Sequence, residues 1–85
     1  MAIWRIDKCK NEAGYRSHAS IYGLIRVGLW TQPVKIGERS SGWPSEEVQA
    51  INAARIAGAS DEQIRELVKA LHAKRAEKLA VLMAA

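Results

Sequence analysis

The side chains of this 85-residue sequence that are best suited to binding chemistry are cations and hydroxyls, in two groups along its first half. One group spans residues 16–26 and the other spans residues 35–39. Arginine and lysine bind phosphate, arginine also binds base edges, and hydroxyl groups can bond to either. We therefore expect a DNA-contact surface made by Arg16, Ser17, His18, Ser20, Tyr22, Arg26, Lys35 and Arg39.

Groups suited to metal binding or covalent catalysis are scarce. Cys9, His18 and His72 are the only thiol and imidazole side chains, too few for a four-ligand zinc site within one chain. A nucleophilic pair of Cys9 and His18 would need the fold to bring them together, and the sequence places no acidic residue to orient the histidine. We therefore expect no enzyme activity, no metal, no cofactor and no small-molecule substrate.

The net positive charge is concentrated in the first half of the chain. Up to Pro44 there are seven basic residues against three acidic ones, whereas six basic residues balance six acidic ones from Ser45 onward. A basic surface attracts nucleic acid by releasing counterions, although solvated basic surfaces are also common in proteins that bind nothing. The distribution of the charges along the chain is therefore more informative about a possible ligand than the total charge of +4.

Two short helices should position the first group of side chains. Asp7 is a candidate N-cap for a helix that runs to about residue 13, where Gly14 can end it. Ser17 is a candidate N-cap for a second helix, which Gly28 ends. The residues between them would form the turn of a helix-turn-helix.

The second helix has one apolar face, made by Ile21, Leu24 and Ile25. Its outward side then carries Ala19, Tyr22, Gly23 and Arg26. A glycine at position 23 costs a helix about 1 kcal/mol relative to alanine. Close approach to DNA and close packing against another helix are both possible reasons for it.

A short hairpin should follow, bounded by Pro33 and Pro44. Residues 34–36 alternate apolar, basic and apolar, residues 37–41 make a polar tip, and residues 42–43 return. Its basic side chains could contact the DNA backbone or the minor groove, or could simply prevent edge-to-edge pairing.

The second half should contain two further helices. Ser45 is a candidate N-cap for one that runs to about residue 57 and is ended by Gly58. Ser60 and Gln63 have the spacing of a capping box that opens the other. The apolar stripe of this last helix, Ile64, Leu67, Val68 and Leu71, is interrupted by Arg75 and Lys78. We expect it to be docked to about Leu71 and to be loosely held, or bound to a partner, beyond.

Three tryptophans could stack on bases, but large aromatic residues at strand ends in so small a domain are usually core residues. We therefore expect Trp30 and Trp43 to be buried, and we leave Trp4 open. The single Cys9 fits a reducing compartment, and no apolar run approaches the ~18 residues of a membrane span. The sequence thus favours a cytoplasmic protein that contacts no membrane.

From about Ile6 to Ile56 the sequence resembles the AlpA family of phage-type transcriptional regulators, which are related to excisionase and MerR-like DNA-binding domains. The matching residues are Ile21, Tyr22, Leu24, Ile25, Gly28, Pro33, Val34, Lys35, Ile36, Gly37, Arg39, Gly42, Trp43 and Ser45 to Val48. The family commonly has arginine or lysine where this chain has His18 and Gly23. The resemblance therefore implies that Arg16, Arg26, Lys35 and Arg39 supply more of the attraction to phosphate here.

The resemblance implies a mainly α fold with a small β-hairpin, a winged helix-turn-helix of the MerR or excisionase type followed by a C-terminal helix. We expect residues 1–58 to form the DNA-binding domain and residues 59–85 to form an amphipathic helix that completes it or binds a partner. The implied function is sequence-specific binding to double-stranded DNA, as a transcriptional regulator of a prophage or integrative element, acting as a homodimer or cooperative oligomer. The alternatives are an excisionase-like recombination directionality factor and a protein-interaction module that acts through helix 60–82.

Overall fold

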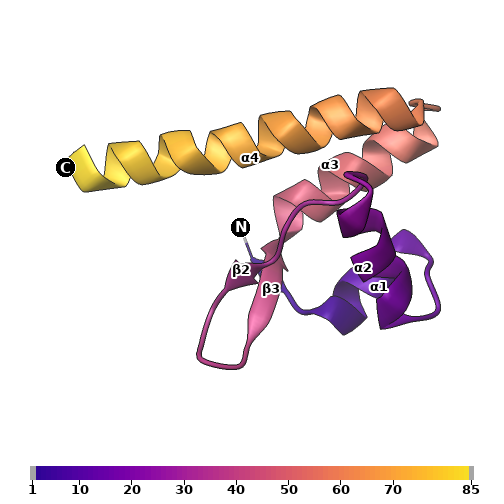
Figure 1. The fold of residues 1–85 in the computed structure, drawn as a ribbon, viewed down its shortest axis with the longest axis horizontal. Helices are drawn as coiled ribbons and strands as arrows, with labels where there is room; N and C mark the ends of the chain where they lie inside the picture. The colour runs from indigo at the N-terminus through magenta and orange to yellow at the C-terminus, as the bar shows by residue number, and fades with distance from the viewer. Residues whose placement is uncertain (1, 85) are drawn as a thin grey trace.

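Seven elements follow one another along residues 2–84, the part of the chain that a computed structural model describes (Figure 1). In chain order they are strand β1 (Ile3–Trp4), helices α1 (Ile6–Ala13) and α2 (His18–Arg26), strands β2 (Val34–Lys35) and β3 (Ser41–Pro44), and helices α3 (Ser45–Ile56) and α4 (Asp61–Ala84). A mainly helical fold with a small hairpin is therefore confirmed. The expected segments 1–58 and 59–85 begin and end at Met1 and Ala85, and these two residues lie outside the described part of the chain.

Several helix ends follow from local sequence signals. Gly14 ends α1 with a φ of 79°, a left-handed conformation that glycine adopts without steric cost. The Ser17 hydroxyl caps α2 by accepting from the backbone N–H of Ser20 at 3.3 Å. The capping box of α4 is present, because Ser60 N–H donates to Gln63 Oε1 at 2.8 Å and Gln63 N–H donates to Ser60 Oγ at 3.2 Å. These three predictions are confirmed.

The predicted N-cap of α1 is wrong. The helix begins at Ile6 with Arg5 as its N-cap, and no side chain caps it. Asp7 lies in the first turn instead, and its carboxylate bonds to the His18 ring at 2.7 Å. A partner on the next helix thus takes the oxygen that a cap would have used, which a local signal cannot anticipate.

The predicted N-cap of α3 is also wrong. Pro44 is the N-cap, and Ser45 is the first helical residue and is buried. Ser45 N–H donates to Ala2 O at 2.8 Å, and its hydroxyl accepts from Ala2 N–H at 3.2 Å. The chain start therefore uses the hydrogen bonds that would have capped the helix.

The sheet has three strands in the order β1-β3-β2, one more than the sequence indicated. β1 pairs antiparallel with β3, with Ile3 opposite Pro44 and Trp4 opposite Trp43. Gly42 allows this close approach, because a Cβ there would lie 2.5 Å from Ile3 Cγ2. A two-residue strand has no period to detect, so it was missed.

The core lies where α1, α2 and α3 meet β3 and the inner face of α4. Trp30 and Trp43 are buried, as predicted, and the Trp43 indole N–H donates to Thr31 O at 2.8 Å. Trp4 is half-buried, with the Lys8 ammonium 5.2 Å from its ring centroid. The buried apolar residues are Cys9, Ile21, Leu29, Trp30, Trp43, Val48, Ile51, Ile64 and Val68.

Helix α4 lies along α3 and is attached further than the apolar stripe suggested. Ile64 and Val68 are buried, and Leu71 is half-buried. One turn beyond, Arg75 Nε donates to Glu47 Oε2 at 2.7 Å, and the Glu47 side chain is only 7 % exposed. Ion pairs thus hold α4 where the apolar contacts stop, and the expectation of docking only to about Leu71 is corrected.

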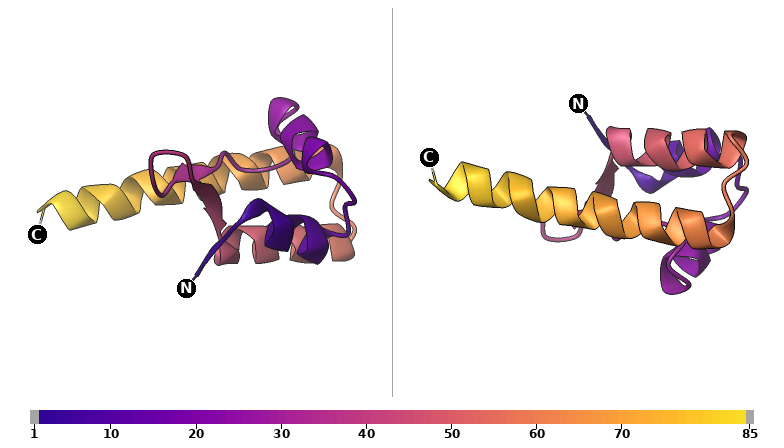
Figure 2. Two further views of the ribbon diagram at one scale, coloured as in Figure 1. Left: turned by 90° about the horizontal axis from the view of Figure 1, so that it is seen from below. Right: turned by 90° about the horizontal axis from the view of Figure 1, so that it is seen from above.

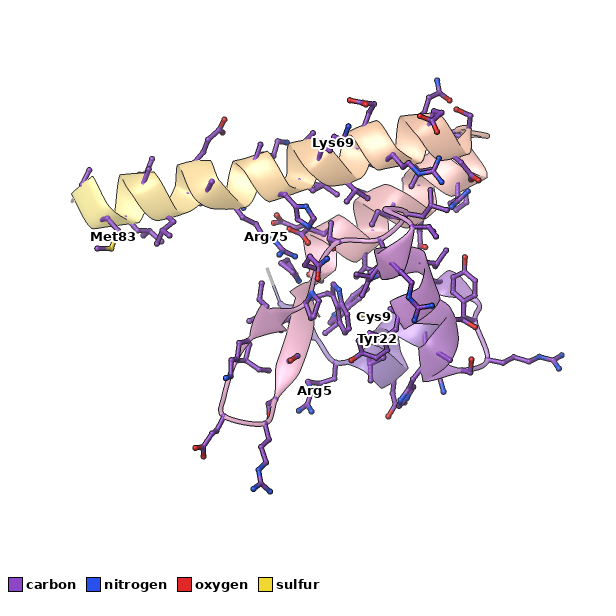
Figure 3. All side chains as sticks on the ribbon, in the orientation of Figure 1. Arg5, Cys9, Tyr22, Lys69, Arg75 and Met83 are labelled. Atoms are coloured by element: carbon purple, nitrogen blue, oxygen red, sulfur yellow. The ribbon has the colours of Figure 1, made fainter. Side chains whose placement is uncertain are left out.

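Helix α4 also makes hydrogen bonds to the connection between α2 and β2. The imidazole Nε2 of His72 accepts from the backbone N–H of Gln32 at 3.0 Å. The Arg75 guanidinium donates to Gln32 O at 2.7 Å, in addition to its bonds to Glu47. Figure 3 shows Arg75 extending from α4 toward the start of α3. One arginine therefore joins α3, α4 and this connection.

The last turns of α4 extend past the remainder of the molecule, as both views of Figure 2 show. Their apolar side chains are exposed; they are Leu79, Val81, Leu82 and Met83. None of the helices within residues 2–84 combines the length and apolar character needed to cross a bilayer.

Candidate nucleic-acid interface

Helix α2 turns one face to the core and the other to solvent. Ile21 is fully buried, and Leu24 and Ile25 are half-buried, which confirms the predicted inward face. On the outward side Tyr22 is 47 % exposed and Arg26 is exposed. The polar side chains of this helix are therefore available to a ligand.

Gly23 lies on the outward side with open space around it. A Cβ built there would meet nothing within 4 Å. Close packing against another helix of this chain is therefore wrong as the reason for this glycine. Close approach of a ligand to the α2 backbone stays a prediction.

The hydroxyl side chains at the start of α2 are engaged with each other. Ser17 Oγ and Ser20 Oγ are 3.1 Å apart, and Ser17 also caps the helix. Arg16, just before them, is exposed and lies in the turn between α1 and α2. One of the two hydroxyls donates to the other, so a phosphate at this end could accept from the remaining hydroxyl hydrogen and bind the Arg16 guanidinium.

Tyr22 connects α2 to the hairpin. Its ring meets the ring of Trp43 on β3 edge-on, with centroids 6.4 Å apart and an interplanar angle of 60°. Such an aromatic pair adds about 0.5–1.5 kcal/mol beyond the area that it buries. Part of the Tyr22 ring thus fixes α2 against β3, while the exposed remainder faces solvent.

His18 has an acidic partner that the sequence analysis did not identify. Its Nε2 lies 2.7 Å from Asp7 Oδ1, and Lys10 Nζ lies 3.8 Å from the same oxygen. The hydrogen bond from His18 lowers the pKa of Asp7, and the charges of His18 and Lys10 add to this effect. A carboxylate therefore sits beside the start of α2, where it would oppose an approaching phosphate.

Cys9 and His18 have different partners in the structure. Cys9 is fully buried, its Sγ lies 3.7 Å from Trp4 O, and burial raises the pKa of its thiol to about 11. Such a thiol holds very little thiolate, the nucleophilic form, at neutral pH. Within residues 2–84, no group of three or more His, Cys, Asp and Glu side chains is arranged to hold a metal ion.

The hairpin carries the second group of cations. β2 and β3 pair with Lys35 opposite Ser41, and Ile36 N–H donates to Ser40 O at 3.0 Å to close the tip. Lys35 and Arg39 are both exposed. Backbone pairing therefore presents these two cations on a short loop.

The α2 helix and the hairpin share one side of the molecule. In Figure 1 both extend away from α4, and in both views of Figure 2 they lie on the same side of α1 and α3. The eight predicted site residues therefore lie on the same side of the molecule, although residues 27–34 separate the two groups along the chain.

Ion pairing divides the cations of the chain into two classes. Seven of the thirteen lysines and arginines have a carboxylate oxygen within 4.0 Å, namely Lys8, Lys10, Arg55, Arg65, Lys69, Arg75 and Lys78. Among residues 2–84 the cations without such a carboxylate are Arg5, Arg16, Arg26, Lys35, Arg39 and Lys74. Five of these six lie in or beside α2 and the hairpin, so the unneutralised positive charge is concentrated there.

Arg5 is a further unpaired cation near the hairpin and was not among the predicted site residues. It is exposed and follows β1 directly. In the view of Figure 3 its side chain projects between the hairpin and α2. The only sequence signal is its position directly after the apolar pair Ile3–Trp4, and that signal has no meaning until the pair is known to join the sheet.

A groove of about 570 Å³ lies elsewhere, between α1 and α3, and is lined by Tyr15, Leu24, Leu29, Trp30, Asn52 and Ile56 among others. The Trp30 indole N–H is buried without a hydrogen-bond partner. Arg55 is the one lysine or arginine among the lining residues and it is paired with Asp61, so none of the unpaired cations lines this groove.

Comparisons of this chain with protein-family models, with curated proteins and with solved structures found no match.

Proposed function

We propose that this chain is a sequence-specific double-stranded DNA-binding protein with a winged helix-turn-helix. In this proposal α2 enters the major groove and the hairpin of β2 and β3 contacts the backbone beside it. The resemblance to the AlpA family supports a role in transcriptional regulation of a prophage or integrative element. An excisionase-like recombination directionality factor is the alternative within the same DNA-binding class.

The observation that carries the proposal is the separation of paired from unpaired cations. Cations that are already neutralised by a carboxylate gain little from a phosphate, whereas unpaired ones release counterions when a phosphate replaces them. The unpaired cations of the first half surround α2 and the hairpin, and the same side carries the open Gly23. A polyanion is therefore the ligand that this surface suits best.

The order and positions of the elements also support the proposal. α1 and α2 are joined by a short turn, and a hairpin follows α2 on the same side of the molecule. In a helix-turn-helix the N-terminal residues of the second helix contact base edges. By this geometry Arg16, Ser17, His18 and Ser20 would contact DNA at the start of α2, and Tyr22 and Arg26 along it. Lys35 and Arg39 would bind the adjacent backbone.

The test is the salt dependence of duplex binding, measured by fluorescence anisotropy. The logarithm of the binding constant should fall with the logarithm of salt concentration, with a slope of about 0.9 per phosphate neutralised. Arg26→Ala and Arg39→Ala should each weaken binding and reduce the slope by about one. Lys74→Ala is the matched control, because Lys74 is also an exposed, unpaired cation but lies on α4. A flat salt response, or equal losses in all three variants, would contradict the proposal.

Selection of bound fragments from the host element's DNA would separate the two DNA-binding roles. Sites at promoters would support regulation, and sites beside the recombination ends would support an excision factor. The spacing and symmetry of the sites would also report whether one copy or two bind together.

A second candidate function is self-association through the end of α4. The observation that favours it is the exposure of Leu79, Val81, Leu82 and Met83 on turns that extend past the globule. An amphipathic helix of this kind can pair with a second copy. Truncation after Lys78 keeps the contacts to Glu46 and Glu47 and removes the apolar end. Sedimentation should show loss of dimer with the α3 and α4 contacts intact, and a chain that sediments as a monomer in both forms would argue against this role.

A further inference from the structure

We propose that Arg5 is a third DNA-contact residue, which binds the backbone phosphate lying between the groove that α2 enters and the groove that the hairpin reaches. This inference rests on the proposed DNA-binding function and extends its surface to the start of the chain. Three structural observations carry it, together with the shape of duplex DNA: the position of Arg5, the rigidity of its attachment, and its lack of a carboxylate partner.

Arg5 lies where the strand that pairs with the hairpin passes into α1. Trp4 pairs with Trp43 on β3, so the residue that follows emerges at the base of the hairpin. Arg5 is also the N-cap of α1, which packs against α2. In the view of Figure 3 the Arg5 side chain projects between the hairpin and α2, on the side toward which the hairpin tip points.

The backbone on both sides of Arg5 is fixed. On one side β1 fits against Gly42, where a Cβ would lie 2.5 Å from Ile3 Cγ2 and 3.0 Å from Trp4 O. Trp4 O also accepts from the buried Cys9 thiol. On the other side Cys9 N–H donates to Arg5 O at 3.1 Å and starts α1. A side chain on such an attachment loses less conformational entropy on binding than one on a mobile terminus.

Arg5 has no carboxylate within 4.0 Å among residues 2–84, although other basic residues near it do. Lys8 pairs with Glu12 and lies over the Trp4 ring, and Lys10 lies near Asp7. The cations around Arg5 are thus used within the fold, whereas its own guanidinium faces solvent. Its positive charge is available to a ligand.

The shape of B-DNA determines what Arg5 would meet. The major and minor grooves are separated by a sugar–phosphate strand, so a group located between a helix in one groove and a loop at the next faces that strand. A guanidinium can bind phosphate oxygens through two parallel N–H donors. The ligand of Arg5 is therefore a phosphate of the duplex, and its contribution should not depend on base sequence.

The experiment compares Arg5→Ala, Arg5→Lys and Lys74→Ala in the full chain, on the selected DNA site and on an unrelated duplex of the same length. Arg5→Ala should weaken binding to both duplexes by the same factor, roughly three- to tenfold at low salt, and reduce the salt slope by about one. Arg5→Lys should keep the wild-type slope, because the slope counts charges. Lys74→Ala should behave as wild type.

Each other result overturns a stated part of the inference. An unchanged slope in Arg5→Ala, with Arg26→Ala and Arg39→Ala still weakened, would overturn the Arg5 assignment alone. A loss that differs between the two duplexes would replace the phosphate contact by a base contact. If Arg5→Lys reduced the salt slope as much as Arg5→Ala does, or if Arg5→Ala unfolded at a clearly lower temperature than wild type, Arg5 would stabilise the fold and would not bind phosphate. A wild-type chain without salt-dependent duplex binding would overturn the proposed function itself.

Discussion

The two halves of the chain use their charged side chains in opposite ways. From Ser45 onward three ion pairs fasten α4 to α3 or close the turn between them, and two more lie within α4. Within residues 2–44 the pairs involve only Lys8, Lys10 and His18, all with acidic residues of α1, and the remaining cations face solvent. A similar number of basic residues thus stabilises the fold in one half and remains available to a ligand in the other. Net charge alone would not reveal this difference.

The largest effect that this comparison predicts is on Arg75. Arg75→Ala would leave the buried Glu47 carboxylate without its cation, which should lower the free energy of unfolding by about 3–5 kcal/mol. Urea unfolding would measure it. Arg39→Ala, at an exposed and unpaired cation, is the control and should change stability by less than about 0.5 kcal/mol. Equal losses in both variants would remove the distinction between the two halves.

Gly42→Ala should have the next largest effect and tests how the first half is held together. The added Cβ would lie 2.5 Å from Ile3 Cγ2 and 3.0 Å from Trp4 O, so β1 must shift. We expect a loss of about 1–3 kcal/mol. Because this half is held by strand pairing and apolar packing, the loss should be the same at low and high salt. Thermal unfolding at two salt concentrations would check this, and a loss that disappears in high salt would contradict it.

Gly23→Ala should change stability and binding in opposite directions. Nothing lies within 4 Å of the added Cβ, so alanine should stabilise α2 by up to about 1 kcal/mol. If the α2 backbone lies close to DNA, the methyl group should weaken duplex binding at the same time. Unfolding and anisotropy measurements on one sample would test both. A stabilised protein with unchanged affinity would show that α2 does not approach DNA at this position.

The smallest predicted effect is at Asp7, the acidic residue nearest the start of α2. Asp7→Asn removes a negative charge from the proposed interface and should raise duplex affinity by roughly two- to fivefold at low salt. Asp7 has a lowered pKa in the folded chain, so its contribution to stability is fully present above its ordinary value of 3.8 and is lost as pH falls through the lowered value. Unfolding measured across that acidic range should therefore show a shallower pH dependence in Asp7→Asn. Unchanged affinity would place Asp7 away from the DNA.

The sequence predicted the elements whose signals are local. The Ser60 and Gln63 capping box, the Ser17 cap and the inward face of α2 all depend on residues within one turn of each other. Long-range partners account for the errors. Asp7 is used by His18, and Ser45 is used by Ala2, 43 residues away, so neither serves as the predicted cap.

The candidate site could be predicted in part for the same reason. The basic side chains on α2 and the hairpin were identified because an amphipathic pattern shows which residues face outward. Whether a cation is free depends on its neighbours in space, as the pair between Arg75 and Glu47 across 28 residues illustrates. Arg5 was not among the predicted site residues, because only the pairing of β1 with β3 brings it beside the hairpin.

The hydrogen bonds from α4 to the backbone of Gln32 link this helix to the DNA-contact elements of the proposal. His72 accepts from the backbone N–H of Gln32 and Arg75 donates to its carbonyl, in the segment that connects α2 to β2. Helix α4 is therefore joined by hydrogen bonds to the connection between the two elements that would contact DNA in the proposed complex. If these hydrogen bonds restrain the hairpin relative to α2, the distribution of distances between labels at Ser20→Cys and Ser40→Cys should be broader in the Arg75→Ala background. A molecule that binds the exposed apolar end of α4 would then change the affinity for DNA from outside the DNA-contact surface.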